Sequence, residues 1–98
     1  MNLNLNYEGF EQNLVTQREC CEDGIQYLFR FENGRGASVV KHSFSYGNQA
    51  DLWELAVVKW NDDNSDWHLD YDTDITDDVL GFLSDEEVRE TLQRIKGL

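Results

Sequence analysis

Between Trp60 and Val88 the chain contains no lysine and no arginine, although eleven carboxylates fall in that stretch. All eight basic residues lie elsewhere and nearly balance the nine remaining acids. The net charge of −12 disfavours direct binding to nucleic acid or to an anionic membrane, because like charges repel. The one-signed stretch is strong enough to steer a basic partner.

Proline is absent, as are Ser/Gly-rich linkers and internal repeats, so the chain of 98 residues predicts one domain, 1–98. Twelve aromatic residues argue against disorder, because disordered chains combine high net charge with few aromatics. No apolar run approaches the roughly 18 residues that a membrane helix needs. The first residues, MNLNLNYEGF, lack the basic and apolar regions of a signal peptide. We therefore expect a cytoplasmic protein.

The N-terminal segment 1–24 gives the weakest pattern. Apolar residues in EGFEQNLVTQR (8–18) have the i, i+4 spacing of a short helix. The only cysteines, Cys20 and Cys21, are adjacent and cannot join distant parts of a fold. We expect ordinary reduced thiols there, with a vicinal disulfide and a soft-metal pair as the alternatives.

The clearest local pattern is a hairpin. Apolar side chains alternate in IQYLFRF (25–31), Asn33-Gly34 favours the positive φ of a tight turn, and ASVVKH (37–42) returns. After a loop, LWELAVVKW (52–60) and WHLDYD (67–72) predict two further strands joined by a polar turn. The prediction is a four-stranded antiparallel meander over 25–72.

Two helices are predicted at the C-terminal end, within 76–97. Asp77-Asp78 suits the first turn of a short helix over VLGFL, where carboxylates meet the positive end of the helix dipole. Ser84 and Glu87 match the capping box that starts a second helix. We therefore expect an α+β fold with the helices packed on one face of the sheet. The apolar stripe of the second helix consists of Val88, Leu92 and Ile95.

Catalysis has little support in the sequence. A nucleophile needs an adjacent base and an orienting group, and the only histidines are His42 and His68. No G-x-S-x-G, H-E-x-x-H or Cys/His metal pattern is present. We expect neither an enzyme nor a bound cofactor.

A metal site is also not predicted. Asp62-x-Asn64-x-Asp66 copies the opening of an EF-hand loop, but the sixth position is tryptophan instead of glycine and the twelfth is threonine instead of glutamate. Alternate acids over 70–74 would lie about 6.6–6.8 Å apart on a strand, which is too far to converge well on one ion.

The remaining interpretation is that the acidic side chains form an exposed surface that binds a partner. Alternation in WHLDYD sends the apolar side chains to one face and the acids to the other. Asp70 and Asp72 have no local structural reason, because aspartate is depleted in strands. A row of carboxylates presents repeated anions, as a nucleic-acid backbone does, and exposed aromatics beside it would anchor a partner. The residues predicted at this contact are Asp62, Asp63, Asp66, Asp70, Asp72 and Asp74, with Phe44 and Tyr46 as anchors.

The chain resembles a group of small acidic proteins encoded by bacteriophages and prophages. The resemblance rests on the segments GASVVKHSFSYG, LWELAVVKW and LDYDTDITDDVLGFLSDEEV. The resemblance covers roughly residues 25–98, and no activity or catalytic residue is attached to it. It implies a product that acts inside a bacterial host cell. Small acidic phage proteins include inhibitors that imitate DNA and block host defence enzymes.

Three functions are consistent with these patterns. The leading one is a non-enzymatic binding protein whose acidic face engages the basic, nucleic-acid-binding surface of a host protein, such as a nuclease or another defence protein. A DNA-mimic inhibitor is one form of it. The alternative is a structural or assembly accessory of the phage particle, in which the acidic face only solubilises. The third is a protein that binds divalent cations weakly through the 62–74 segment.

Overall fold

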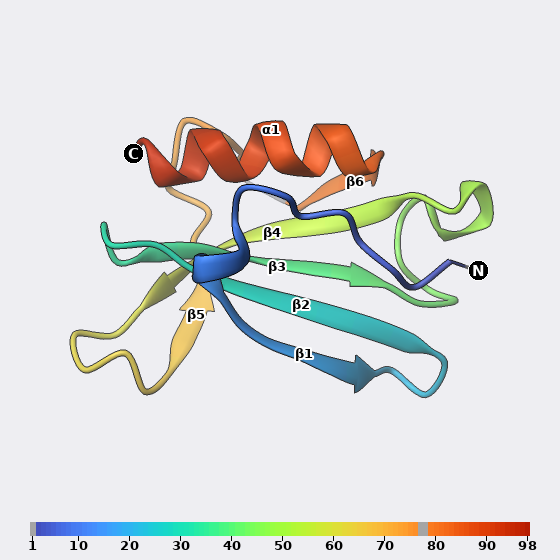
Figure 1. The fold of residues 1–98 in the computed structure, drawn as a ribbon, viewed down its shortest axis with the longest axis horizontal. Helices are drawn as coiled ribbons and strands as arrows, with labels where there is room; N and C mark the ends of the chain where they lie inside the picture. The colour runs from blue at the N-terminus through green and yellow to red at the C-terminus, as the bar shows by residue number, and fades with distance from the viewer. Residues whose placement is uncertain (1, 77–78) are drawn as a thin grey trace.

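The computed structural model describes residues 2–76 and 79–98, which form an antiparallel sheet with one α-helix packed on it (Figure 1). The predicted α+β class and the C-terminal helix on one face of an antiparallel sheet are confirmed. The elements are β1 (Leu14–Cys20), β2 (Gly24–Arg30), β3 (Arg35–Lys41), β4 (Trp53–Trp60), β5 (Trp67–Leu69), β6 (Leu80–Leu83) and α1 (Asp85–Lys96), with 3-10 turns η1 (Glu11–Asn13) and η2 (Asn48–Ala50).

The predicted number of strands is wrong. The sheet has six strands, in the order β1-β2-β3-β4-β5, with β6 also paired with β4. β5 and β6 share one edge of β4: β5 pairs with Val58, Lys59 and Trp60, and β6 pairs with Trp53 and Leu55. The predicted meander over 25–72 corresponds to β2–β5, to which β1 adds beside β2 and β6 adds beside β4.

The predicted N-terminal helix is wrong. Leu14–Cys20 forms β1, which pairs with β2 along its whole length apart from a register shift between Leu14 and Thr16. β2 is buried on both faces, and without β1 its outer backbone groups would lack partners. Only Leu14, Thr16 and Cys20 of β1 are half-buried, so the strand carries a weak apolar signal.

The predicted helix over VLGFL is also wrong, because Leu80–Leu83 forms β6 and completes the edge of β4. A short apolar run cannot be assigned to strand or helix by periodicity alone. Asp77 and Asp78 lie outside the described residues. The second predicted helix is confirmed: Ser84 Oγ accepts from Glu87 N at 3.2 Å, and Glu87 Oε1 accepts from Ser84 N at 3.1 Å.

The main core lies between α1, the N-terminal segment 2–10 and one face of the sheet (Figure 1). Val88, Leu92 and Ile95 are fully buried, and burying each contributes about 1.5–3 kcal/mol. Leu5 and Phe10 close the same core from the N-terminal segment. In the described ranges no helix is long and apolar enough to cross a membrane.

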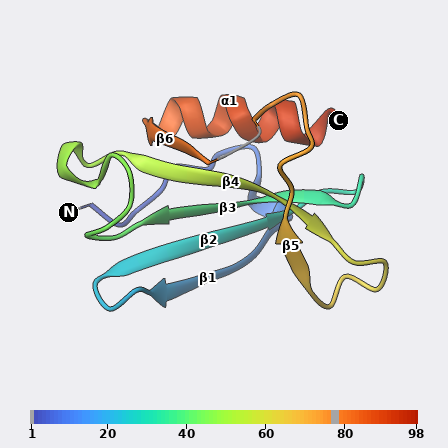
Figure 2. The ribbon, with the colours of Figure 1, turned by 180° about the vertical axis from the view of Figure 1, so that it is seen from behind.

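The opposite face of the sheet has a smaller apolar cluster of Leu28, Val58 and Trp60, with Trp67 packed against it. Seen from this side, β5 lies at a steep angle to β2 and β3 (Figure 2). The guanidinium of Arg30 lies 5.3 Å from the centre of the Trp60 ring. The middle of the sheet is therefore buried on both faces.

The turns gather at two ends of the sheet (Figure 1). The aromatic end, at the right in Figure 1, holds the β1–β2 turn, the 42–52 loop and the start of α1. The hairpin end, at the left, holds the β2–β3 turn, the β4–β5 turn (61–66) and the end of α1. Asn33 Nδ2 donates to Ile95 O at 2.9 Å, which fixes the end of α1 to the β2–β3 turn.

Candidate protein-binding surfaces

The β4–β5 turn is held by its own polar side chains. Asn61 Oδ1 accepts from Ser65 N at 2.9 Å and from Asp66 N at 3.1 Å. Asp63 Oδ1 accepts from Ser65 Oγ at 2.6 Å and from Ser65 N at 3.0 Å, and these bonds lower the pKa of Asp63. Asp62, Asp63 and Asp66 are all exposed, so the turn presents its carboxylates to solvent.

Asp70 does not belong to an exposed display. The residue is 8% exposed, and Oδ2 accepts from Arg35 Nε at 3.2 Å. Its Oδ1 accepts from Asp72 N at 3.0 Å. The prediction that Asp70 has no structural reason is therefore wrong. β5 ends at Leu69, and beyond it the predicted alternation fails, since Tyr71 is exposed while Asp70 is buried.

Asp72 and Asp74 are exposed and line a shallow hollow with Arg35. Lys59, also exposed, pairs with His68 in the register of β4 and β5. The stretch that carries one sign of charge in the sequence is thus flanked by cations from other strands. The hairpin end also contains Arg94 and Lys96, from the end of α1.

Three aromatic side chains are exposed at the aromatic end. Phe44 is 87% exposed, and Tyr46 and Phe82 are each 62% exposed. Phe44 and Tyr46 were predicted to lie beside the acids of 62–74, but the eight residues of β4 separate the 42–52 loop from the β4–β5 turn. At about 3.3 Å per residue this separation is roughly 25 Å.

Phe82 was not among the predicted site residues, because its segment was assigned to a helix. It lies in β6, and Phe82 N donates to Tyr46 O at 3.4 Å. The 42–52 loop and β6 meet through glycines. A Cβ on Gly81 would lie 2.6 Å from Tyr46 Cβ, and one on Gly47 would lie 2.9 Å from Phe82 Cα.

Phe82 has a left-handed backbone conformation, with φ of 59°. Such a conformation is uncommon outside glycine, asparagine and aspartate, and it is a genuine outlier for a bulky residue. Gly47 also has a positive φ, 94°, at the start of η2. Glycine readily adopts a positive φ, but no sequence pattern indicates one at Phe82, so the contact between Tyr46 and Phe82 could be found only from the structure.

The 42–52 loop itself is braced. Ser45, 2% exposed, donates through Oγ to His42 O at 2.9 Å and accepts from His42 N at 3.0 Å. Leu52 N donates to Gly47 O at 2.9 Å. The exposed aromatics therefore project from an ordered loop, not from a loose one.

The two histidines lie in different parts of the fold. His42 lies at the aromatic end, where Nδ1 accepts from Phe44 N at 3.1 Å, and His68 lies on β5. The thiols of Cys20 and Cys21 are free, with their sulfurs 2.7 Å apart. Burial, and then Cys21, raises the pKa of Cys20 to about 11, so its thiol stays protonated at neutral pH. Within the described residues no three His, Cys, Asp or Glu side chains are placed to hold a metal ion.

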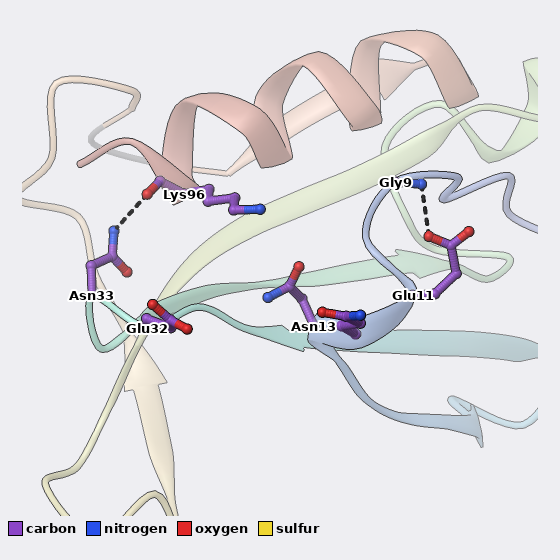
Figure 3. Close-up of a pocket in the computed structure, with 7 residues that line it drawn as sticks. Gly9, Glu11, Asn13, Glu32, Asn33 and Lys96 are labelled. Atoms are coloured by element: carbon purple, nitrogen blue, oxygen red, sulfur yellow. Dashed lines mark hydrogen bonds between the residues drawn. The ribbon is translucent and has the colours of Figure 1, made fainter.

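One hollow has a volume of about 770 Å³ and lies between η1, the β2–β3 turn and the end of α1 (Figure 3). Its charged groups are Glu11, Glu32 and Lys96, and all three are exposed. The bonds drawn there join Asn33 to the Lys96 carbonyl and Gly9 N to Glu11. It is an open polar basin without a buried functional group.

Comparison with known proteins adds no relative. No protein-family model, curated protein or solved structure matches this chain. The surfaces described above are therefore interpreted from their own geometry and chemistry.

Proposed function

We propose that this protein is a non-enzymatic binding protein, encoded by a phage or prophage, that engages a basic, nucleic-acid-binding surface of a bacterial host protein. The observation that supports the proposal is the exposure of five of the six predicted carboxylates, three of them on an ordered turn. These are Asp62, Asp63, Asp66, Asp72 and Asp74.

The charges would act mainly at long range. With a net charge of −12 the molecule attracts a basic surface, and such attraction raises the association rate more than it slows dissociation. Repeated carboxylates would occupy positions that the partner normally offers to phosphates. The protein would then compete with DNA or RNA for its partner, as a DNA-mimic inhibitor of a nuclease or another defence protein does.

Capture from a bacterial host lysate tests this function. The protein and its Asp62→Asn/Asp63→Asn/Asp66→Asn variant are immobilised, and bound proteins are compared at about 50 mM and 500 mM salt, where screening differs strongly. The control variant, Glu8→Gln/Glu19→Gln/Glu90→Gln, removes the same charge elsewhere. We expect the wild type to capture a partner that is displaced by added DNA or RNA and released by high salt. The turn variant should capture this partner poorly, and the control variant should capture it as the wild type does.

Capture that survives high salt, or that both variants reduce equally, would reject a carboxylate-directed contact.

One observation favours a second candidate, a structural or assembly accessory of the phage particle. The exposed aromatics at the other end of the sheet offer an apolar contact that needs no charge. In that case charge removal would be silent, and substitution of the aromatics would abolish assembly.

A further inference from the structure

We propose that Phe44, Tyr46 and Phe82, the aromatic patch, form the short-range contact surface for a basic protein segment that carries apolar side chains. The inference rests on the proposed function and deepens it. It adds, at the aromatic end, an apolar contact that slows the dissociation of a partner attracted by the carboxylates.

The patch is unusual for a surface. Its three side chains lie over a hollow of about 490 Å³ that is formed by residues 43–50 together with Phe82. Contiguous exposed apolar groups in a monomer mark interaction sites more often than isolated ones. Aromatic side chains are also the residues that most often carry binding energy in protein interfaces.

Folding does not explain why Phe82 is where it is. A residue that is 62% exposed contributes little burial, while φ of 59° costs of order 1–3 kcal/mol. Gly81 and Gly47 allow the close approach that sets Phe82 beside Tyr46. The chain therefore keeps a strained, exposed aromatic where glycine or asparagine would fit with less strain, which is expected of a residue kept for binding.

The charges around the patch select the partner. Asp51 accepts from Asn2 N at 2.7 Å and Asp23 accepts from Ser43 N at 3.2 Å, and both carboxylates lie at the aromatic end. Glu86 is exposed in the first turn of α1, close behind Phe82 in the chain. Lys41, 1% exposed, pairs with Asp51 Oδ1 at 3.1 Å, so Asp23 and Glu86 are the carboxylates that remain to attract a basic segment.

The two ends of the sheet thus differ. Arg35 and Lys59 accompany the acids of the hairpin end, whereas exposed carboxylates and exposed aromatics occur together at the aromatic end. A basic segment with apolar side chains complements both features. Carboxylates would set the association rate, and the aromatics would set the dissociation rate.

Two synthetic peptides of equal length and charge provide the probe. One alternates lysine with leucine, and the other alternates lysine with serine. Binding is followed by fluorescence anisotropy at low salt, with wild-type protein and the variants Phe44→Ala, Tyr46→Ala and Phe82→Ala. Tyr71→Ala is the matched control, because Tyr71 is an exposed aromatic outside the patch.

We expect the wild type to bind the lysine–leucine peptide at least about tenfold more tightly than the lysine–serine peptide. A difference of this size is typical of one strong interface contact. The patch variants should lower that ratio towards one without changing lysine–serine binding, and Tyr71→Ala should keep it. Phe44 is almost fully exposed, so its variant reports on binding even if Phe82→Ala is less stable.

Equal affinity of the wild type for the two peptides, or an equal loss in Tyr71→Ala, would overturn the aromatic patch and leave the proposed function standing. Failure of both peptides to bind at low salt would overturn the two together. Sedimentation supplies the other decisive result: a wild-type dimer that Phe44→Ala dissociates would assign the patch to a second copy of the chain.

Discussion

The ammonium of Lys41 lies 4.1 Å from the centre of the Trp53 ring, inside the aromatic end of the sheet. Its Nζ donates to Asn2 O at 2.7 Å, to Asp51 O at 2.8 Å and to Asp51 Oδ1 at 3.1 Å. A buried charge is stable only when it is paired and hydrogen-bonded. Lys41 therefore ties the N-terminal segment and the 42–52 loop to β4, beneath the loop that bears Phe44 and Tyr46.

Replacing Lys41 by methionine should destabilise the fold. The substitution leaves three acceptors without the ammonium, and we expect the free energy of unfolding to fall by about 2–4 kcal/mol, less than for a fully buried ion pair because Asp51 is half-exposed. Urea denaturation measures it. Lys59→Met is the control, since Lys59 is exposed, and it should change stability by less than about 0.5 kcal/mol. Equal effects at the two lysines would contradict the role of Lys41.

The same bonds predict an acid-sensitive fold. The backbone N–H of Asn2, and then Lys41, lower the pKa of Asp51 below its ordinary value of 3.8. A carboxyl whose pKa is lowered by folding contributes stability above its unfolded pKa and loses it as the pH falls through the folded value. Asp51→Asn has no carboxyl to protonate at this position, so the variant should lose less stability than the wild type as the pH falls below about 4. Denaturation curves from pH 2.5 to pH 6 measure this, and a variant curve parallel to the wild type would refute it.

Asp70 and Asp72 should respond differently to the same substitution. Asp70→Asn removes the charge opposite Arg35 from a buried site, so unfolding free energy should fall by about 1–2 kcal/mol, allowing for the partial exposure of Arg35. Asp72→Asn, at an exposed position, should stay within about 0.5 kcal/mol of the wild type. Thermal or urea denaturation compares them. A larger loss of unfolding free energy in Asp72→Asn than in Asp70→Asn would contradict a stabilising role for the ion pair between Asp70 and Arg35.

The sequence predicted those parts of the fold that local chemistry decides. The Asn33-Gly34 turn lies between β2 and β3, and the capping box of Ser84 and Glu87 starts α1. Both depend on residues within a few positions of one another. The antiparallel pairing of β2 with β3 follows from the same short turn, whereas the longer 42–52 loop joins β3 to β4.

Features set by distant residues could not be predicted. β1 is polar on most of its length, and its assignment depends on the unpaired edge of β2. Asp70 is buried because Arg35, on another strand, reaches it. The aromatic patch needs the approach of β6 to the 42–52 loop, which two glycines permit and no periodicity reveals. Five predicted carboxylates are exposed, but their distance from Phe44 and Tyr46 is a property of the sheet.

The capping box at the start of α1 tests whether local side-chain contacts stabilise the helix. Ser84→Ala removes the hydroxyl that accepts from Glu87 N and should lower unfolding free energy by about 1 kcal/mol, the usual effect of losing an N-cap. Ser84→Asp keeps an acceptor at the cap and should retain most of the wild-type value. Chemical denaturation separates the two. Equal losses in both variants would show that some other contact of Ser84 matters more than its cap.

The strain at Phe82 predicts a reversal in the order of two substitutions. At an ordinary backbone position alanine is more stable than glycine by about 0.5–1 kcal/mol, because glycine is more flexible when unfolded. At φ of 59° an alanine keeps its unfavourable Cβ while glycine does not, so Phe82→Gly should be the more stable variant by about 1 kcal/mol. At Phe44, which has no positive φ, alanine should be the more stable one. Urea denaturation of the four variants gives the two differences directly. If alanine were at least as stable as glycine at both positions, Phe82 would carry no strain, and the inference that it is retained for binding would lose its energetic basis.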